Sequence, residues 1–114
     1  MQRAEVWLIT LDPTTVGAEI KKTRPVVILS SDDVGTLPLK IVAPLTDWKE
    51  HYADVPWLVL VNPAQQNGLA KPSACDTFQV RSVSVERFIR RLGSLDAGTM
   101  QTISRALAEV LQIT

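Results

Sequence analysis

The chain has 114 residues, 46% of them hydrophobic, so residues 1–114 are expected to form one domain that buries a core without disulfides or metal. Twelve basic and twelve acidic residues cancel, so bulk charge predicts neither a nucleic-acid binder nor a membrane-surface protein, and a polyanion would need a local patch. The single cysteine, the absence of a signal-like segment and the absence of an apolar run of ~18 residues predict a soluble, cytoplasmic protein.

The first half of the chain predicts three strands separated by polar segments. Residues 5–11 are rich in β-branched and aromatic side chains and end at a turn signal, Asp12-Pro13. Residues 12–23 form a loop that is long for a hairpin connection. Residues 26–30, which are apolar on both faces, predict a central strand. Residues 40–46 predict a third strand, in which Pro44 implies an edge or a bulge.

The second half predicts further strands and one helix. Residues 57–61 form a fourth strand, residues 74–83 form one or two more, and residues 85–91 form a short helical turn. After Asp96, a plausible N-cap, apolar residues recur at helical spacing. These residues are Met100, Ile103, Leu107, Val110 and Leu111. Strands followed by a single helix predict a mainly β fold with a C-terminal α-helix, of the small SH3-like barrel type.

Arg24 is the most informative candidate for a functional site. The ring of Pro25 disfavours helical backbone at Arg24, and proline is tolerated as the first residue of a strand. The arginine is therefore expected at the mouth of a buried strand, after the polar loop. A guanidinium fixed there suits phosphate, to which it donates two parallel hydrogen bonds. The ordinary alternative is a strand-edge arginine in a structural salt bridge.

Several other chemistries lack support. No Gly-rich phosphate loop is present, and one His with one Cys does not supply a closed zinc set, so no cofactor or metal is expected. Nucleophilic catalysis by Cys75 with His51 is conceivable. Against it, a cysteine within a strand is usually a small buried residue, and His51 lies in a charged loop.

Further polar residues fall at predicted strand ends. Thr46 closes the third strand, whereas Gln79 and Arg81 alternate on the fifth. Glu19, Lys21 and Lys22 lie on the loop before Arg24. Each has an ordinary explanation as a β-branched strand residue, a solvated face or a surface ion pair.

These residues belong to a pattern that resembles the MazF/PemK family. Its N-terminal signature is similar to EVWL at 5–8, LDPT at 11–14, VGAE at 16–19 and KTRPVVILS at 22–30. VAPLT at 42–46 resembles the family's APLT strand. Its third block is similar to Asp76 with QVRSV at 79–83, then Arg87-Phe88 and Arg91-Leu92-Gly93. The match covers nearly the whole chain in the family's order.

The resemblance implies a toxin of a toxin–antitoxin pair that acts as a homodimer on an SH3-like barrel. Family members are metal-independent endoribonucleases that cut single-stranded RNA, leaving a 2′,3′-cyclic phosphate and a 5′-hydroxyl. Arg24 and Thr46 match the family's catalytic arginine and threonine. Glu19 and Gln79 match positions lining the RNA groove, and Glu19 is also our candidate general base. The chain departs from many members in the spacing between Asp76 and Gln79.

The remaining expectations concern RNA contacts and partners. A local basic stripe would consist of Lys21, Lys22, Arg24 and Arg81. Trp48, Trp57 and Phe78 are candidate stacking partners for bases, with core burial as the ordinary alternative. A cognate antitoxin would lay a disordered acidic segment across the basic groove. Two other functions stay open: a non-catalytic toxin of the same fold that inhibits DNA gyrase, and a degenerate interaction module.

Overall fold

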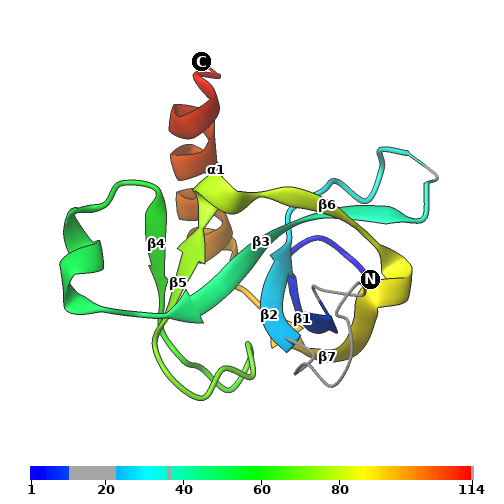
Figure 1. Cartoon of the computed structure of the whole chain (residues 1–114), viewed down its shortest axis with the longest axis horizontal. Coiled ribbons are helices and arrows are strands. Elements are labelled where there is room, and N and C mark those ends of the chain that lie inside the picture. Colours follow the sequence, from blue (N-terminus) through cyan, green and yellow to red (C-terminus); the bar gives the residue numbers. More distant parts are fainter. Residues whose placement is uncertain (11–22, 36, 114) are drawn as a thin grey trace, which may run out of the picture.

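A computed structural model of the chain describes residues 1–10, 23–35 and 37–113. These residues contain seven strands, three short 3₁₀ helices and one α-helix. The strands are β1 (Glu5–Thr10), β2 (Thr23–Ile28), β3 (Leu39–Asp47), β4 (Leu58–Val61), β5 (Ser73–Asp76), β6 (Arg81–Ser84) and β7 (Phe88–Ser94). The helical elements are η1 (Glu50–Asp54), η2 (Thr77–Gln79), η3 (Val85–Arg87) and α1 (Ala97–Leu111). The prediction of a mainly β fold with a C-terminal helix is confirmed (Figure 1).

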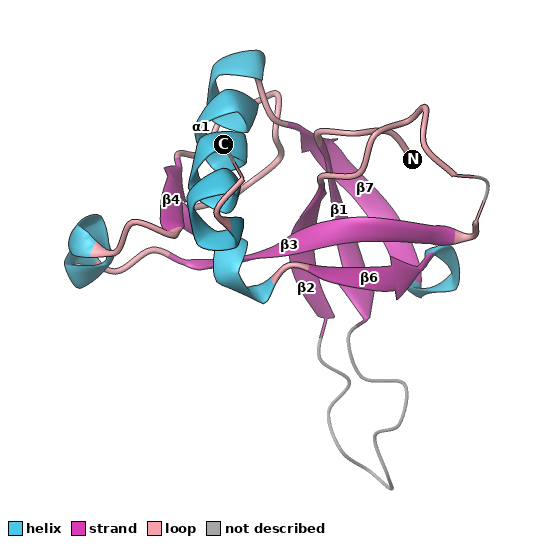
Figure 2. Cartoon of the chain, turned by 90° about the horizontal axis from the view of Figure 1, so that it is seen from above, coloured by secondary structure: helices cyan, strands magenta, loops and turns pink. Residues whose placement is uncertain are grey.

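The strands form one antiparallel sheet in the order β4-β5-β3-β2-β1-β7, and β6 pairs with the first half of β3. Figure 2 shows α1 and β4 at one end, with β1, β2, β6 and β7 at the other and β3 running between them. In the described ranges no ladder joins β6 to β7. The sheet is therefore barrel-like without being closed, which fits the predicted SH3-like barrel loosely.

Because side chains alternate along a strand, β3 contributes to two separate cores. Ala43 and Leu45 join the helix-side core, whereas Val42 joins the barrel core. The helix-side core comprises Val6, Val27, Leu29, Ala43, Leu45, Val59, Val61, Cys75, Leu95, Met100, Ile103 and Ala106. The barrel core comprises Ile9, Val26, Ile28, Val42 and Val83. Of the predicted apolar stripe of α1, Met100 and Ile103 belong to the helix-side core and Leu107 packs against it, whereas Leu111 is 56% exposed.

Local capping explains where α1 begins. The Asp96 carboxylate accepts a hydrogen bond of 2.6 Å from the backbone N–H of Thr99, which satisfies a donor that the first helical turn leaves free. This bond, strongest to the charged form, holds the pKa of Asp96 below its usual range. The predicted N-cap is confirmed. At the other end, Gln112 adopts a left-handed conformation and closes the helix.

The sequence reading was wrong at two places. Residues 85–91 are not simply a helical turn, because η3 ends at Arg87 and Phe88–Ser94 form β7, which pairs with β1. The segment 74–83 contains two strands separated by η2, so Gln79 lies in a 3₁₀ turn and does not alternate with Arg81 on a strand. In both places, pairing with a distant strand decides the conformation.

Candidate functional site

An opening in the sheet forms where β3 leaves β2. The two strands pair at Ile28 with Val42 and at Val26 with Pro44, and the ladder stops there. Beyond Pro44, which has no backbone N–H to donate, β3 pairs with β5 instead. Arg24 precedes Val26 by two residues, and Thr46 follows Pro44 by two residues. Because side chains alternate along a strand, Arg24 and Thr46 lie on the same face of the sheet as Val26 and Pro44. They therefore flank the opening from its two sides.

A cavity of about 310 Å³ lies at this opening, and we call it the arginine cavity. Its apolar lining consists of Val26, Val42 and Pro44. Its polar lining consists of Arg24, Thr46, Gln79 and Arg81. Since Val26 and Val42 belong to the barrel core, the cavity lies at the edge of that core, where polar side chains replace apolar ones.

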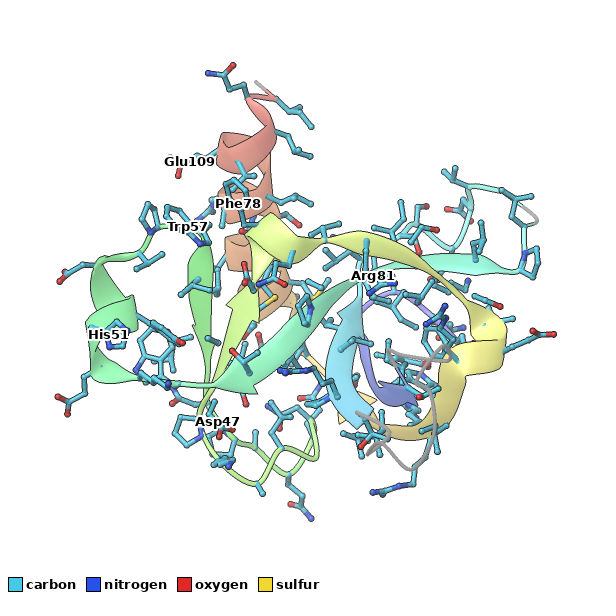
Figure 3. The ribbon with its side chains drawn as sticks, viewed as in Figure 1. Asp47, His51, Trp57, Phe78, Arg81 and Glu109 are labelled. Atoms are coloured by element: carbon cyan, nitrogen blue, oxygen red, sulfur yellow. The ribbon has the colours of Figure 1, made fainter. Side chains whose placement is uncertain are left out.

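Strand register brings Arg81 to the same cavity. In β6, Val83 is opposite Lys40 and buried in the barrel core, and Arg81, two residues earlier, is opposite Val42. Arg81 therefore lies on the same face of the sheet as the barrel core, at the edge of that core, where its side chain is exposed (Figure 3). Within the described ranges, neither Arg24 nor Arg81 has a side-chain hydrogen bond or an ion pair. The cavity thus carries two guanidinium charges that no carboxylate in those ranges neutralises.

A second cavity of about 870 Å³, the loop cavity, adjoins the first, because Arg24 and Thr46 line both. Its further polar residues are Thr23, Asp47, Lys49, Tyr52, Lys71, Ser73 and Arg90. Lys71 Nζ lies 3.1 Å from Asp47 Oδ2, and both side chains are well exposed, so water weakens this ion pair. The loop cavity thus extends from Arg24 toward Lys49, Lys71 and Arg90, and its lining is basic and partly apolar.

The segment 62–72 forms one wall of the loop cavity and is held by buried contacts. The side chain of Asn67 donates to the Asn62 carbonyl at 2.9 Å and accepts from the backbone N–H groups of Ala64 and Leu69, both at 3.0 Å. Gly68 has φ +69° and passes so close to Leu92 that an added Cβ would lie 2.1 Å from its carbonyl oxygen. The wall is therefore rigidly packed against β7.

Four of the predicted site residues meet at one place. Arg24, Thr46, Gln79 and Arg81 all line the arginine cavity, although they come from four different elements. Glu19, Lys21 and Lys22 lie outside the described residues. Sequence reasoning missed Lys49, Tyr52, Lys71 and Arg90 of the loop cavity. The charged character of segment 47–54 could have indicated Lys49. Arg90 was missed because residues 85–91 were predicted to form a helical turn and not part of strand β7.

The alternative of Cys75–His51 catalysis is excluded by the surroundings of the thiol. Cys75 is fully buried in the helix-side core, and burial, with the neighbouring Asp76 charge, raises its pKa to about 12. The thiolate that nucleophilic attack requires is therefore absent near neutral pH. His51 is exposed and packs edge-on against Tyr52.

Two of the candidate stacking residues lie elsewhere. Trp57 and Phe78 pack edge to face with ring centroids 5.6 Å apart, beside Glu109 of α1 (Figure 3). Phe78 is 65% exposed, so it is not a core residue. It also does not line the arginine cavity. Trp48 packs against Tyr52 at 5.8 Å.

In the described part of the chain, no group of three or more His, Cys, Asp or Glu side chains is placed to hold a metal ion. None of its helices has the length and apolar character needed to cross a bilayer. The chemistry of the site consists of cationic and neutral hydrogen-bond donors around an opening in a sheet. That arrangement suits a phosphate group.

Comparison with known proteins agrees with this chemistry. Residues 2–111 match the family of PemK-like, MazF-like toxins of type II toxin–antitoxin systems. The chain is 31% identical over 114 residues to a Mycobacterium tuberculosis protein named Endoribonuclease MazF9, covering 94% of this chain and 92% of that protein.

Solved structures share the fold. The Mycobacterium tuberculosis toxin MazF-mt6 superposes with a TM-score of 0.76 at 24% identity, covering 96% of this chain and 98% of that one. A mycobacterial endoribonuclease solved with its cognate antitoxin gives a TM-score of 0.75 at 18% identity, covering 100% and 97% of the two chains. At these identities the likeness establishes the architecture alone.

Proposed function

This chain belongs to the PemK-like, MazF-like toxins of type II toxin–antitoxin systems, and from that premise we propose that it is an endoribonuclease that cuts single-stranded RNA. The observation that carries the proposal is the arginine cavity, where Thr46, Gln79 and two guanidiniums converge that have no ion pair within the described residues. The 31% identity to a protein named an endoribonuclease supports the same activity. The reaction needs no metal ion.

In the proposed reaction the neighbouring 2′-hydroxyl oxygen forms a bond to phosphorus, and the bond from phosphorus to the 5′-oxygen breaks. A base removes the proton of the 2′-hydroxyl, and the departing 5′-oxygen gains a proton. The products are a 2′,3′-cyclic phosphate and a 5′-hydroxyl. DNA lacks the attacking hydroxyl and is not cut.

Arg24 and Thr46 bind the scissile phosphate in this proposal, because they flank the opening between β2 and β3. The transition state carries extra negative charge on the phosphoryl oxygens, and Arg24 is held in advance by the β2 backbone between Thr23 and Pro25. The Thr46 hydroxyl donates a hydrogen bond to the same group. Removing one preorganised donor of this kind costs about 10²–10³ in rate.

The other predicted residues take supporting roles. Arg81 and Gln79 contact the nucleotide that lies in the arginine cavity, and Lys21 and Lys22 contact neighbouring phosphates. Glu19 takes the proton of the 2′-hydroxyl. The basic residues of the loop cavity, Lys49, Lys71 and Arg90, extend the phosphate track on the far side of Arg24.

The proposed partners follow from the toxin family. The toxin acts as a homodimer in the cytoplasm, where RNA and its antitoxin are both present. A cognate antitoxin neutralises it by laying an acidic segment over Arg24 and Arg81, as charge complementarity favours. A gyrase inhibitor or a bare interaction module needs no phosphate site, and no observation favours either function.

The test is cleavage of labelled single-stranded RNA in EDTA, with analysis of the new ends. We expect a cyclic phosphate and a 5′-hydroxyl, and no cleavage when the 2′-hydroxyl at the cut position is replaced by hydrogen. Arg24→Ala is expected to lower kcat about 10²–10³-fold. The matched control is Arg105→Ala, since Arg105 is exposed on α1 and lines neither site cavity. Full activity of folded Arg24→Ala protein would refute the mechanism.

A further inference from the structure

The turn between β5 and β6 contains a hydrogen-bond arrangement that the proposed reaction does not use. One oxygen of Asp76, Oδ1, accepts from the backbone N–H of Phe78 at 3.0 Å. Its other oxygen, Oδ2, accepts from the side-chain Nε2 of Gln79 at 2.7 Å. Asp76 therefore caps η2 with one oxygen and holds the Gln79 amide with the other.

The turn that carries this pair is itself fixed. Thr77 is 1% exposed, and both its backbone N–H and its hydroxyl donate to the carbonyl oxygen of Trp57, at 3.0 and 2.7 Å. Strand β5, which ends at Asp76, is paired on both sides, with β3 and with β4. The Gln79 amide is therefore anchored to the framework.

The chemistry of the carboxylate decides how the Gln79 amide is oriented. An ionised Asp has no proton to donate, so it accepts hydrogen bonds only, and only the NH₂ end of the amide satisfies it. The carbonyl oxygen of Gln79 then occupies the other arm of the amide. In the described part of the chain this oxygen has no hydrogen-bond partner, and Gln79 lines the arginine cavity. This oxygen is the acceptor that Gln79, held through its NH₂ end, can offer to a ligand in the cavity that Arg24 and Thr46 also line.

We propose that Asp76 is a positioning residue that orients Gln79 to select, next to the scissile phosphate, an RNA base with an exocyclic amino group. Cytosine N4, adenine N6 and guanine N2 are such amino groups and donate to this acceptor, whereas uracil has none and carries an acceptor, O4, where cytosine has N4. This inference rests on the proposed endoribonuclease activity. Asp76 is the N-cap of η2 and Gln79 is its last residue, so one turn of 3₁₀ helix brings the two side chains together.

The substitution that tests the inference is Asp76→Asn. The asparagine oxygen can still accept from the N–H of Phe78, so the cap of η2 is kept. Its NH₂ group then replaces Oδ2 opposite Gln79 and favours the flipped amide, with the carbonyl toward residue 76 and NH₂ toward the RNA. The hydrogen-bond polarity seen by the base is reversed while the size of both side chains is unchanged.

The assay compares kcat and KM for oligonucleotides that differ only at the base beside the cut. We expect the wild-type protein to prefer cytosine or adenine over uracil by about tenfold in kcat/KM, which corresponds to about 1.4 kcal/mol. Asp76→Asn is expected to abolish or invert that preference. Asp54→Asn, on exposed η1, is the matched control and keeps it.

A double-variant cycle separates positioning from a structural role. Gln79→Met removes the amide and is expected to lose the base preference by itself. In that background Asp76→Asn should have no further effect on the preference, whereas a structural role of Asp76 would lower activity in both backgrounds. RNA cleavage with an unchanged preference in Asp76→Asn would overturn this inference and leave the proposed function standing. Failure of the wild-type protein to cut RNA would instead overturn the proposed function.

Discussion

Gly93 lies in β7 where this strand passes under the segment 62–72, and replacing it with alanine tests how that wall of the loop cavity is held. An added Cβ would lie 2.3 Å from the carbonyl oxygen of Gln66, and 2.6 and 2.8 Å from backbone atoms of Asn67. All three neighbours are backbone atoms, which no side-chain rotation moves away. The segment must therefore retreat until the contact with oxygen reaches at least 3.0 Å.

The cost has two parts. Forcing an extra methyl group into a packed site costs about 1–3 kcal/mol. The same displacement strains the 3.0 Å hydrogen bond from the Ser94 N–H to the Gln66 carbonyl, which contributes about 1 kcal/mol. We therefore expect Gly93→Ala to lower the free energy of unfolding by about 2–4 kcal/mol and Tm by about 10 °C.

The measurement is thermal and urea unfolding followed by circular dichroism, with Gly98→Ala as the matched control. An added Cβ at Gly98 would have its nearest neighbour, Asp96 Oδ1, at 3.6 Å, and alanine favours the helix by up to about 1 kcal/mol. Gly98→Ala is thus expected to raise Tm slightly. If Gly93→Ala unfolds at or above the wild-type temperature, the close packing of the wall against β7 is refuted.

Further predictions concern three other residues. The Cys75 thiol should resist iodoacetamide at pH 8 in folded protein and react in urea, because a pKa raised from 9.0 to about 12 lowers the thiolate population about a thousandfold. Burial of the neutral Cys75 thiol contributes fully to the free energy of unfolding below pH 9, and this contribution is lost as the pH rises toward 12. Urea titrations at several pH values measure that loss. Asn67→Ala should destabilise the fold by about 1–3 kcal/mol in urea unfolding, because two partly buried backbone N–H groups lose their acceptor. Arg81→Ala should reduce the slope of log affinity against log salt by about 0.7 in RNA-binding titrations; an unchanged slope would mean that Arg81 touches no phosphate.

The parts of the site that the sequence predicted are those that local chemistry determines. Arg24 precedes a proline, so its backbone is extended wherever the strand begins, and β2 includes it, opposite Ile9. Thr46 follows an apolar run and a proline, which mark the end of strand pairing with β2. Neither position depends on knowing which strands are neighbours. The catalytic roles proposed for them rest on the family resemblance.

The parts that the sequence did not predict depend on pairing between distant segments. In β7, Ile89, Arg90 and Arg91 are all exposed, so no alternation of polar and apolar residues marks them as a strand. Only the ladder with β1 makes this segment extended, and that ladder contains irregularities of its own. Arg90 reaches the loop cavity by this pairing, beside Lys49 and Lys71 from two other segments.

The distribution of ion pairs resolves the apparent conflict between a neutral chain and a polyanionic substrate. Glu5 lies 3.5 Å from Arg91 and 3.7 Å from the N-terminal amine, so its charge offsets groups outside the arginine cavity. Arg24 and Arg81 have no such partner in the described ranges. Among the described residues, a chain with net charge zero thus leaves a local excess of positive charge where β3 departs from β2. Because Arg24 is only partly exposed and apolar residues of the barrel core line that place, water screens its guanidinium less than it screens the exposed Lys71–Asp47 pair. The course of β3 between two cores therefore creates both the opening proposed to bind a phosphate and the positive charge that would attract it.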